Sequence, residues 1–293
     1  MKRTRPSEIK ELLNSRDIHP SRVLGQNFLI DQNILNIILD SAHVADADRV
    51  LEIGPGLGVL TEHLIRLCPH VVAIEKDPRL AEYLRETFEQ YPNLSLLEGD
   101  ALELNLPELI RAHAITHVVS NLPYSSGTRM LVEMVDADPR PLRFVVMLQL
   151  DVAERIVAKP GTKAYGLLSI HAQLHYDVVI RKQVSHSCFY PPPDVKSAII
   201  ELYRLETPRV NLTDEMYFRE LIKWCFSQRR KQLGTILQHA PARITGGTPI
   251  ADALTDLELA ASLRPEQLDV TDWGRLSNRL SSGCPGNLQQ NRG

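Results

Sequence analysis

The sequence has few cysteines, no long apolar run and no basic surplus, and each shortage excludes a class of protein. Its 293 residues include four cysteines without a Cys-x-x-Cys pair or another metal-ligand spacing: Cys68, Cys188, Cys225 and Cys284. No segment approaches the roughly 20 apolar residues of a membrane span, and the basic first residues lead into charged ones rather than into a signal-peptide core. We therefore expect a cytoplasmic protein with reduced thiols and without a zinc site, a disulfide or a membrane anchor.

The missing basic surplus argues against broad attraction to nucleic acid. The chain has 33 Lys and Arg residues against 36 Asp and Glu residues, for a formal net charge of -3. Binding to phosphate must therefore be local. Two clusters are candidates, the basic first 25 residues and the run Arg229-Arg230-Lys231, although a merely solvated surface is an equally good interpretation of each cluster taken alone.

Short apolar runs alternate with amphipathic segments through the first two thirds of the chain. The pattern predicts strands at 49–53, 70–75, 94–98, 116–120 and 143–148, and helices at 32–42, 58–67, 78–89 and 127–135. This order predicts an α/β fold, a mostly parallel sheet with helices on both faces. A helix at 164–174 and two β-rich runs, 176–184 and 195–204, would then close one edge of the sheet.

The character of the sequence changes near residue 206. The segments that follow predict helices at 214–226, with Thr213 as its cap, and at 229–238, 251–261 and 271–280. We therefore divide the chain into a large domain, 1–206, which includes a basic extension at 1–25, and a smaller helical domain, 207–281. The Gly- and Pro-containing polar end, 282–293, is expected to be a disordered tail.

A glycine-rich loop follows the strand predicted at 49–53. Glycines 54, 56 and 58 let the backbone turn sharply and approach a ligand without a Cβ in the way. The dinucleotide-binding pattern needs a glycine where this chain has Val59, which disfavours an NAD-dependent dehydrogenase. A methyltransferase cofactor therefore fits the loop better, with a purely structural tight turn as the alternative for Gly54 and Gly56.

Acidic residues end the next two predicted strands. Glu75 is placed to accept the two ribose hydroxyls of a nucleoside cofactor, and Asp100 to accept from its adenine amino group. Each carboxylate alone could be a helix cap or a solvated charge. Together with the glycine loop they form a series of strand ends at the edge where open α/β sheets bind ligands.

The fourth strand leads into Asn121-Leu122-Pro123-Tyr124, which suits methylation of a planar amine. The Asn121 amide oxygen and the Leu122 carbonyl can accept the hydrogens of adenine N6, while Pro123 makes the turn rigid. Tyr124 can stack on the base and fix its plane. A strand end with structural Pro and Tyr residues is the less favoured interpretation.

At this point the sequence resembles the ribosomal RNA adenine N6-dimethyltransferase family, and most closely its bacterial small-subunit type, from about residue 21 to 280. The motifs that carry the resemblance are Gly25-Gln26-Asn27-Phe28-Leu29, Glu52-Ile53-Gly54-Pro55-Gly56, Ile74-Glu75, Gly99-Asp100-Ala101, Asn121-Leu122-Pro123-Tyr124, Phe189-Tyr190-Pro191-Pro192-Pro193 and Gln228-Arg229-Arg230-Lys231.

The resemblance implies a Rossmann-like domain that uses S-adenosylmethionine, and a helical domain that contacts the ribosome. Asn27, Leu29 and Asn121 would touch the cofactor, and Phe189 would lie near the target base, although an ordinary core Phe is the alternative for it. The implied activity is transfer of two methyls to each of two adjacent adenosines near the 3′ end of small-subunit ribosomal RNA, by a monomer with a role in subunit biogenesis.

Two other functions stay open. A large-subunit rRNA adenine dimethylase would share the loop and the Asn-Leu-Pro-Tyr motif, but the Gln228-Arg229-Arg230-Lys231 run and the long helical C-terminal region favour the small-subunit type. The chain could also act mainly as a ribosome-assembly or RNA-binding factor. In either case Arg229, Arg230 and Lys231 are the predicted RNA-binding residues.

Overall fold

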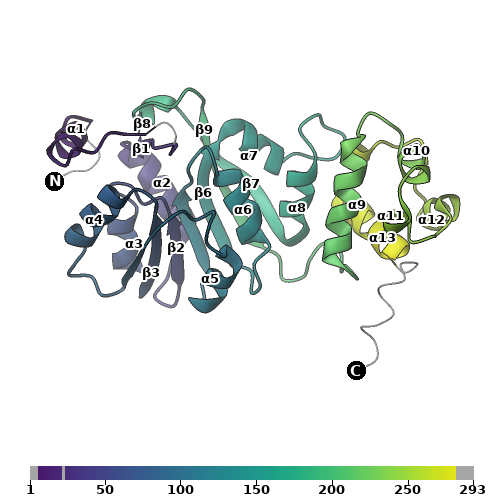
Figure 1. Cartoon of the computed structure of the whole chain (residues 1–293), viewed down its shortest axis with the longest axis horizontal. Coiled ribbons are helices and arrows are strands. Elements are labelled where there is room, and N and C mark those ends of the chain that lie inside the picture. Colours follow the sequence, from purple (N-terminus) through teal and green to yellow (C-terminus); the bar gives the residue numbers. More distant parts are fainter. Residues whose placement is uncertain (1–5, 22–23, 282–293) are drawn as a thin grey trace. The chain divides into compact units, whose positions relative to one another are not determined.

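The computed structural model describes residues 6–21 and 24–281, which form two compact units (Figure 1). The first unit holds the described residues up to 154 together with 177–204, and the second holds 155–176 together with the residues from 205 on. The chain enters the second unit for the second time at residue 205, beside the boundary predicted at 206. Residues 155–176, predicted in the large domain, group instead with the second unit, because Ala158, Tyr165, Ile170 and Leu174 are buried in its core. The predicted disordered tail lies outside the described residues.

The first unit is built on a seven-stranded sheet. From one edge to the other, its strands are β4 (Leu94–Glu98), β3 (His70–Glu75), β2 (Arg49–Ile53), β5 (His117–Asn121), β6 (Arg143–Gln149), β9 (Ser197–Arg204) and β7 (Tyr176–Val184). The strands from β4 to β6 are parallel, and β9 runs antiparallel to β6. The predicted parallel sheet is therefore confirmed, as is its closure by the two β-rich runs.

Helices cover both faces of this sheet (Figure 1). They are α2 (Gln32–Ala42), α3 (Thr61–Leu67), α4 (Pro78–Thr87), α5 (Leu106–Ala112), α6 (Gly127–Val135) and α7 (Leu150–Ile156). One core joins Val50, Val119 and Val145 of the sheet to the apolar stripes of α2, α3 and α4. Because both faces are covered, the central strands are continuous apolar runs rather than alternating ones.

Local chemistry explains where several helices begin. The Asp31 side chain accepts hydrogen bonds from the backbone nitrogens of Asn33 and Ile34 and so caps α2. The helix predicted at 58–67 begins only at Thr61, because Gly58 has a φ of +73° that no helical residue adopts. The pattern did not predict α5, α7 or α1 (Pro6–Ser15).

A small second sheet connects two distant parts of the first unit. Strand β1 (Phe28–Leu29) pairs antiparallel with β8 (Phe189–Tyr190), which follows the short 3-10 helix η1 (His186–Cys188). In this register Leu29 lies opposite Phe189. The pairing brings the segment before α2 to the segment before β9, more than 150 residues away in the sequence.

The second unit packs its helices around Trp273. They are α8 (Leu167–His175), α9 (Glu215–Ser227), α10 (Leu233–Gln238), α11 (Ala242–Thr245), α12 (Ile250–Asp256) and α13 (Val270–Ser281), with the 3-10 helix η2 (Pro265–Gln267). Asp214 caps α9 through Tyr217 N, so the predicted cap at Thr213 is wrong by one residue. The helix predicted from 229 begins only at Leu233.

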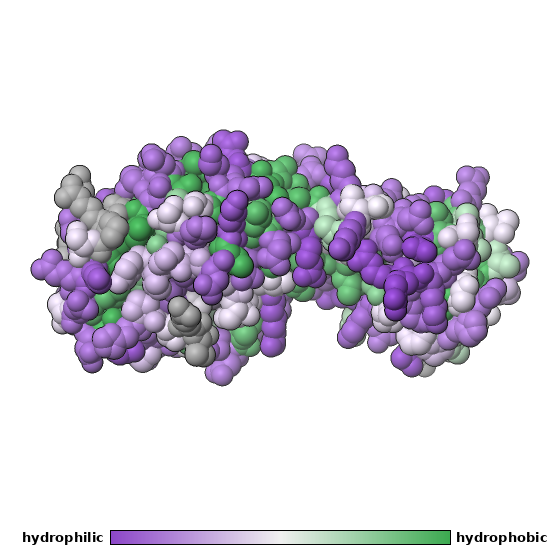
Figure 2. Space-filling view, turned by 90° about the horizontal axis from the view of Figure 1, so that it is seen from above, coloured by the Kyte–Doolittle hydropathy of each residue, from purple (hydrophilic) through white to green (hydrophobic). Residues whose placement is uncertain are grey.

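No helix in the described part of the chain is long and apolar enough to cross a membrane. The face drawn in Figure 2 is mostly hydrophilic, with apolar side chains in small groups between polar ones. The large apolar side chains lie mainly inside the cores of the two units.

Candidate active site

One cavity of about 310 Å³ lies at the carboxyl ends of β2, β3, β4 and β5. Ten residues predicted from the sequence contribute to its lining: Asn27, Leu29, Gly54, Gly56, Glu75, Asp100, Asn121, Leu122, Pro123 and Tyr124. The topology explains this assembly, because parallel strands bring their carboxyl ends to one edge of the sheet. Phe189, the other predicted residue of the first unit, reaches the site through its contact with Tyr124.

The glycine loop after β2 can only be made by glycines. Gly54 and Gly56 have φ angles of +69° and +58°, in the left-handed region. A Cβ at Gly56 would lie 3.1 Å from the Phe28 ring, and one at Gly58 would lie 2.6 Å from the Phe88 ring. The loop is therefore tightly packed from outside while its backbone faces the cavity, as a ligand-binding turn requires.

Glu75 holds the loop in place as well as lining the cavity. Its side chain accepts from the backbone nitrogens of Gly56, at 3.0 Å, and Asp77, at 2.9 Å. Glu75 is only 5% exposed, and this burial raises the pKa of its carboxyl. Each carboxylate oxygen has a second lone pair, so Glu75 can still accept the hydroxyls predicted for it.

Asp100, at the end of β4, is an ionised acceptor. Its Oδ2 lies 2.6 Å from the Lys76 ammonium, and its Oδ1 accepts from Leu102 N at 3.0 Å. The hydrogen bond from Lys76 holds the pKa of this carboxyl below its usual range. Sequence analysis did not single out Lys76, although it follows Glu75 directly at the strand end.

The Asn121 side chain lies in the cavity with its amide nitrogen bonded and its amide oxygen without a partner among the described residues. Its Nδ2 donates to the backbone oxygen of Asn27 at 3.1 Å. Its Oδ1 is buried and has no hydrogen-bond partner in the part of the chain that the structure describes. A buried acceptor without a partner costs stability unless a ligand supplies the donor. The amide is therefore turned so that its oxygen is available.

The Tyr124 ring is fixed by two contacts from the segment around β8 and β9. Its hydroxyl is hydrogen-bonded to Ser197, and its ring meets Phe189 edge-on, with centroids 6.4 Å apart and planes at 75°. Burial raises the pKa of Tyr124 to about 12, so the residue stays neutral. Sequence analysis missed Ser197, because no local pattern shows that β9 returns beside β6.

The segment 24–29 forms one wall of the cavity. Gln26 donates to Asp77 Oδ2 at 3.1 Å, and a Cβ at Gly25 would lie 3.2 Å from Tyr124 N. Together with the bond between Asn27 and Asn121, these contacts tie the segment to both halves of the site. This explains why the resemblance singles out Asn27 and Leu29, which lack any chemical signature of their own.

Glu52 is a further cavity residue that sequence analysis did not assign. It lies in β2, is 2% exposed, and accepts a hydrogen bond from the Thr61 hydroxyl at 2.7 Å. Burial raises the pKa of its carboxyl to about 8. The available signal was a lone acidic residue inside the apolar run Val50-Leu51-Glu52-Ile53.

The predicted RNA-binding run lies in the second unit, in the turn after α9. Arg229 is half-buried, donates to Lys163 O at 3.2 Å and pairs with Glu266 at 3.6 Å. Lys231 is exposed and donates to Gln228, and Arg230 is exposed without a side-chain hydrogen bond or ion pair to any described residue. Arg229 therefore stabilises the unit, and the role of the run in RNA binding stays a prediction.

Two Lys or Arg residues of the basic N-terminal stretch are described, Lys10, which is exposed, and Arg16. Arg16 pairs with Glu86 at 2.5 Å and lies over the Tyr83 ring, while Ile9 and Leu13 of α1 are buried in the core of the first unit. This helix is a packed element of the fold. Most of the remaining basic residues of the stretch lie outside the described residues.

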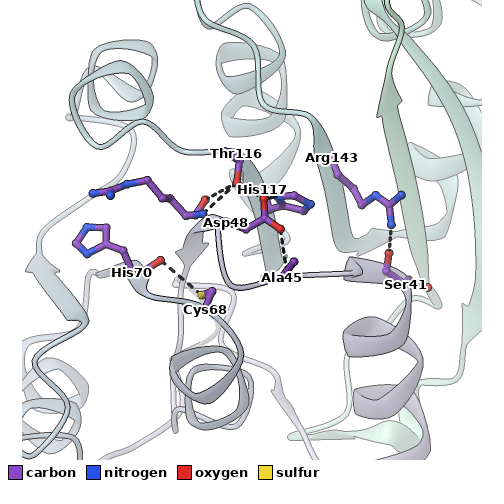
Figure 3. A network of polar contacts seen from close by, with 9 residues as sticks. Ser41, Ala45, Asp48, Cys68, His70, Thr116, His117 and Arg143 are labelled. Atoms are coloured by element: carbon purple, nitrogen blue, oxygen red, sulfur yellow. Dashed lines mark hydrogen bonds and ion pairs between the residues drawn. The ribbon is translucent and has the colours of Figure 1, made fainter.

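A second polar cluster lies at the opposite, amino ends of the strands (Figure 3). Asp48 accepts from Thr116 Oγ1 at 3.0 Å and from Ala45 N at 2.8 Å, and lies 3.2 Å from His117 Nδ1. Arg143 donates to Ser41 O at 2.9 Å. These bonds link β2, β5 and β6 to α2 and its following loop, which is a structural role. The described residues contain no cluster of His, Cys, Asp and Glu suited to a metal ion.

The fold and the cavity define a class of protein, the Rossmann-like methyltransferases, with a glycine loop after the first central strand and acidic residues at the ends of the next two. The sequence matches the family described as ribosomal RNA adenine dimethylase over residues 20–268, and the chain belongs to that family.

Similar proteins share almost the whole chain. Ribosomal RNA small subunit methyltransferase A of Geobacter metallireducens is 38% identical over 270 residues, which cover 92% of this chain and 98% of the relative. The protein of the same name from Enterococcus faecalis is 38% identical, over 96% of this chain and 97% of its own.

Two solved structures show the same fold. A dimethyladenosine transferase from Plasmodium falciparum has a TM-score of 0.75 and 28% identity, over 87% of this chain and 98% of its own. The 23S rRNA methyltransferase ErmE has a TM-score of 0.65 and 25% identity, over 87% of this chain and all of its own. The predicted family, fold class and enzyme class, an S-adenosylmethionine-dependent rRNA adenine methyltransferase, are confirmed.

Proposed function

We propose that this protein transfers methyl groups from S-adenosylmethionine to N6 of two adjacent adenosines near the 3′ end of small-subunit ribosomal RNA. The observation that carries the proposal is the unpartnered, buried Oδ1 of Asn121, in the same cavity as Tyr124. An exocyclic amine is the donor that this oxygen lacks. The names of the curated relatives, which cover nearly the whole chain, favour the small subunit over the large one.

The cavity can hold the cofactor with groups already in place. The backbone of Gly54 and Gly56 leaves room for the amino-acid part, Glu75 can accept the ribose hydroxyls, and Asp100 can accept the adenine amino group. Bound S-adenosylmethionine supplies a methyl group on a positively charged sulfur. The residues proposed to touch it all belong to one chain, so the proposed chemistry needs no second copy of the protein.

The target amine is activated by acceptors and by orientation. Adenine N6 is a weak nucleophile because its lone pair is delocalised into the ring. Asn121 Oδ1 and the Leu122 carbonyl accept its two hydrogens and favour a tetrahedral nitrogen, while the ring of Tyr124 stacks on the base. The methylated nitrogen is cationic and loses its proton afterwards, so no strong base is needed. Positioning of this kind can lower a barrier by roughly 7 kcal/mol or more.

The test is mass spectrometry of nucleosides from small ribosomal subunits that lack the modification. We expect dimethyladenosine to appear when the subunits are incubated with the protein and S-adenosylmethionine. Its position is then mapped on the RNA. Large subunits are incubated in parallel. Modification of large-subunit RNA alone would support the alternative dimethylase, and tight binding to subunits without methylation would support a pure assembly factor. A protein that acts on ribosomal subunits would work in the cytoplasm.

We also propose that Arg230 and Lys231 contact the RNA, since both are exposed while Arg229 is held by Glu266. Replacing both by Gln should weaken binding to small subunits and lower the slope of log affinity against log salt by roughly 0.7 to 0.9 per lost contact. Replacing Arg243 and Arg264, exposed cations of the same unit, is the matched control. An unchanged slope would show that the run is only a solvated turn.

A further inference from the structure

The described lining of the cavity is acidic, and its one cation is already engaged. Its lining contains three carboxyl groups, Glu52, Glu75 and Asp100, and one basic side chain, Lys76. Lys76 pairs with Asp100. Glu75 has backbone donors, and Glu52 has the neutral hydroxyl of Thr61. Among the described residues the two buried carboxyls therefore have no cation to balance them, and the cavity suits a cationic ligand.

In the part of the chain that the structure describes, the surroundings of Glu52 contain no cation. From β3 it faces Glu75, and from the start of α3 it faces Thr61. The remaining cavity residues of the loop, of β5 and of the segment 24–29 are uncharged. A carboxyl that is buried without a cation and beside a second carboxyl keeps its proton near neutral pH. The raised pKa of about 8 agrees with this geometry.

The order of the strands assigns each part of the cofactor to one of them. Asp100 follows β4 and Glu75 ends β3, which places the adenine and the ribose on that side of the sheet. The methyl must face Asn121, at the end of β5. The strand between β3 and β5 is β2, so the amino-acid end of the cofactor, with its ammonium group, lies toward Glu52.

We propose that Glu52 binds the ammonium group of S-adenosylmethionine and releases its own proton when the cofactor enters, so that cofactor binding is linked to pH. This inference rests on the proposed cofactor site. The carboxylic acid becomes a carboxylate, the proton passes to the solvent buffer, and the ammonium replaces it as the partner of the acid. No redox step or further reactant is needed.

The linkage predicts the sign of the pH dependence. Below pH 8 the free protein must lose a proton in order to bind, so affinity rises with pH, by up to tenfold per pH unit, and levels off above pH 8. At pH 7, where the carboxyl of the free protein is mostly protonated, binding should release most of one proton. The product S-adenosylhomocysteine keeps the ammonium but lacks the charge on sulfur. It should therefore release the same fraction.

The experiment is calorimetric titration of the full chain with both ligands at pH 7, in phosphate and in Tris, whose different ionisation enthalpies report the protons exchanged. We expect Glu52→Gln to bind without proton release, because the amide resembles the protonated acid. Its affinity should not change with pH, so the ratio of wild-type to variant affinity should rise by roughly 50-fold between pH 6 and pH 8. Glu103→Gln, which removes an exposed carboxyl, is the control and should behave as the wild type.

Four other results would each overturn a different part of the proposal. Tight binding of S-adenosylmethionine without proton exchange would overturn the linkage and leave the proposed function intact. Proton release that persists in Glu52→Gln would overturn the assignment to Glu52. Release with S-adenosylmethionine but not with S-adenosylhomocysteine would overturn the assignment to the ammonium group. Failure of the wild type to bind either ligand would overturn the proposed cofactor site itself.

Discussion

The two ends of β2 carry one carboxyl each, and their surroundings are opposite. Asp48, just before the strand, has Thr116, His117 and the Ala45 nitrogen around it (Figure 3). Glu52, near the end of the strand, has one neutral hydroxyl and a second carboxyl. At the amino ends of the strands the polar groups therefore bond to one another. At the carboxyl ends the cavity holds acceptors that lack a donor or a cation among the described residues.

The difference separates polar groups that serve the fold from those that serve a ligand. A buried acceptor with its donors in place contributes to stability, whereas one without them lowers stability. Asn121 Oδ1 belongs to the second kind, and Glu52 has a neutral hydroxyl but no cation among the described residues; both line the cavity. Changes at the carboxyl ends should therefore damage catalysis or binding, and changes at the amino ends should damage the fold.

The largest expected effect is at Asn121. Asn121→Ala removes the acceptor for the target amine, so the rate of methyl transfer should fall by at least about 100-fold, a larger loss than that of affinity for S-adenosylmethionine. Single-turnover kinetics and calorimetry measure the two separately. Asn33→Ala, in an exposed position of α2, is the control. A variant with near-normal turnover would remove Asn121 from the mechanism.

The next effect concerns stability against pH at Glu52. Its pKa is 4.5 in the unfolded chain and about 8 in the fold, so the folded state keeps a proton that the unfolded state loses. The stabilisation that protonated Glu52 contributes is therefore complete below pH 4.5 and is lost as pH rises through 8. At pH 8, ligand-free Glu52→Gln should therefore be more stable than the wild type, with a free energy of unfolding larger by on the order of a few kcal/mol. At pH 4 the two proteins should be equally stable. A stability difference between the variant and the wild type that does not change with pH would contradict this.

At the amino ends, Asp48→Ala should lower the free energy of unfolding by about 1 to 3 kcal/mol, because the Ala45 nitrogen, the half-buried Thr116 side chain and the buried His117 side chain lose their acceptor. Urea unfolding measures the loss. Cofactor affinity of the folded protein should stay normal, and Asp46→Ala, at an exposed position, should change neither quantity. A loss of cofactor binding without a loss of stability would contradict the assignment of the amino ends to the fold and of the carboxyl ends to the ligand.

The smallest effect is expected at Ser197, which fixes the Tyr124 ring from outside the cavity lining. Ser197→Ala and Tyr124→Phe should each slow methyl transfer by roughly 3- to 10-fold, the value of one hydrogen bond, with unchanged cofactor affinity. The double variant should be no slower than either single one, because both remove the same bond. Ser197→Thr, which keeps the hydroxyl, should restore the rate. Additive losses would show that the two residues act independently.

Much of the cofactor side of the site could be predicted from the sequence. The alternation of apolar runs and amphipathic segments indicated the parallel sheet, whose carboxyl ends must meet at one edge. The glycine loop, Glu75, Asp100 and the Asn-Leu-Pro-Tyr turn each directly follow or end a strand, so local patterns alone placed them together. Such features depend on backbone geometry and on neighbours a few residues away.

Only the tertiary structure decided which distant segments complete the site. The pairing of Leu29 with Phe189, the bond from Asn121 to Asn27 and the contact of Ser197 with Tyr124 join residues 73 or more positions apart. No local periodicity records such contacts. The protonation of Glu52 and the grouping of 155–176 with the second unit likewise depend on what packs around them, because burial is a property of the folded chain and not of the residue.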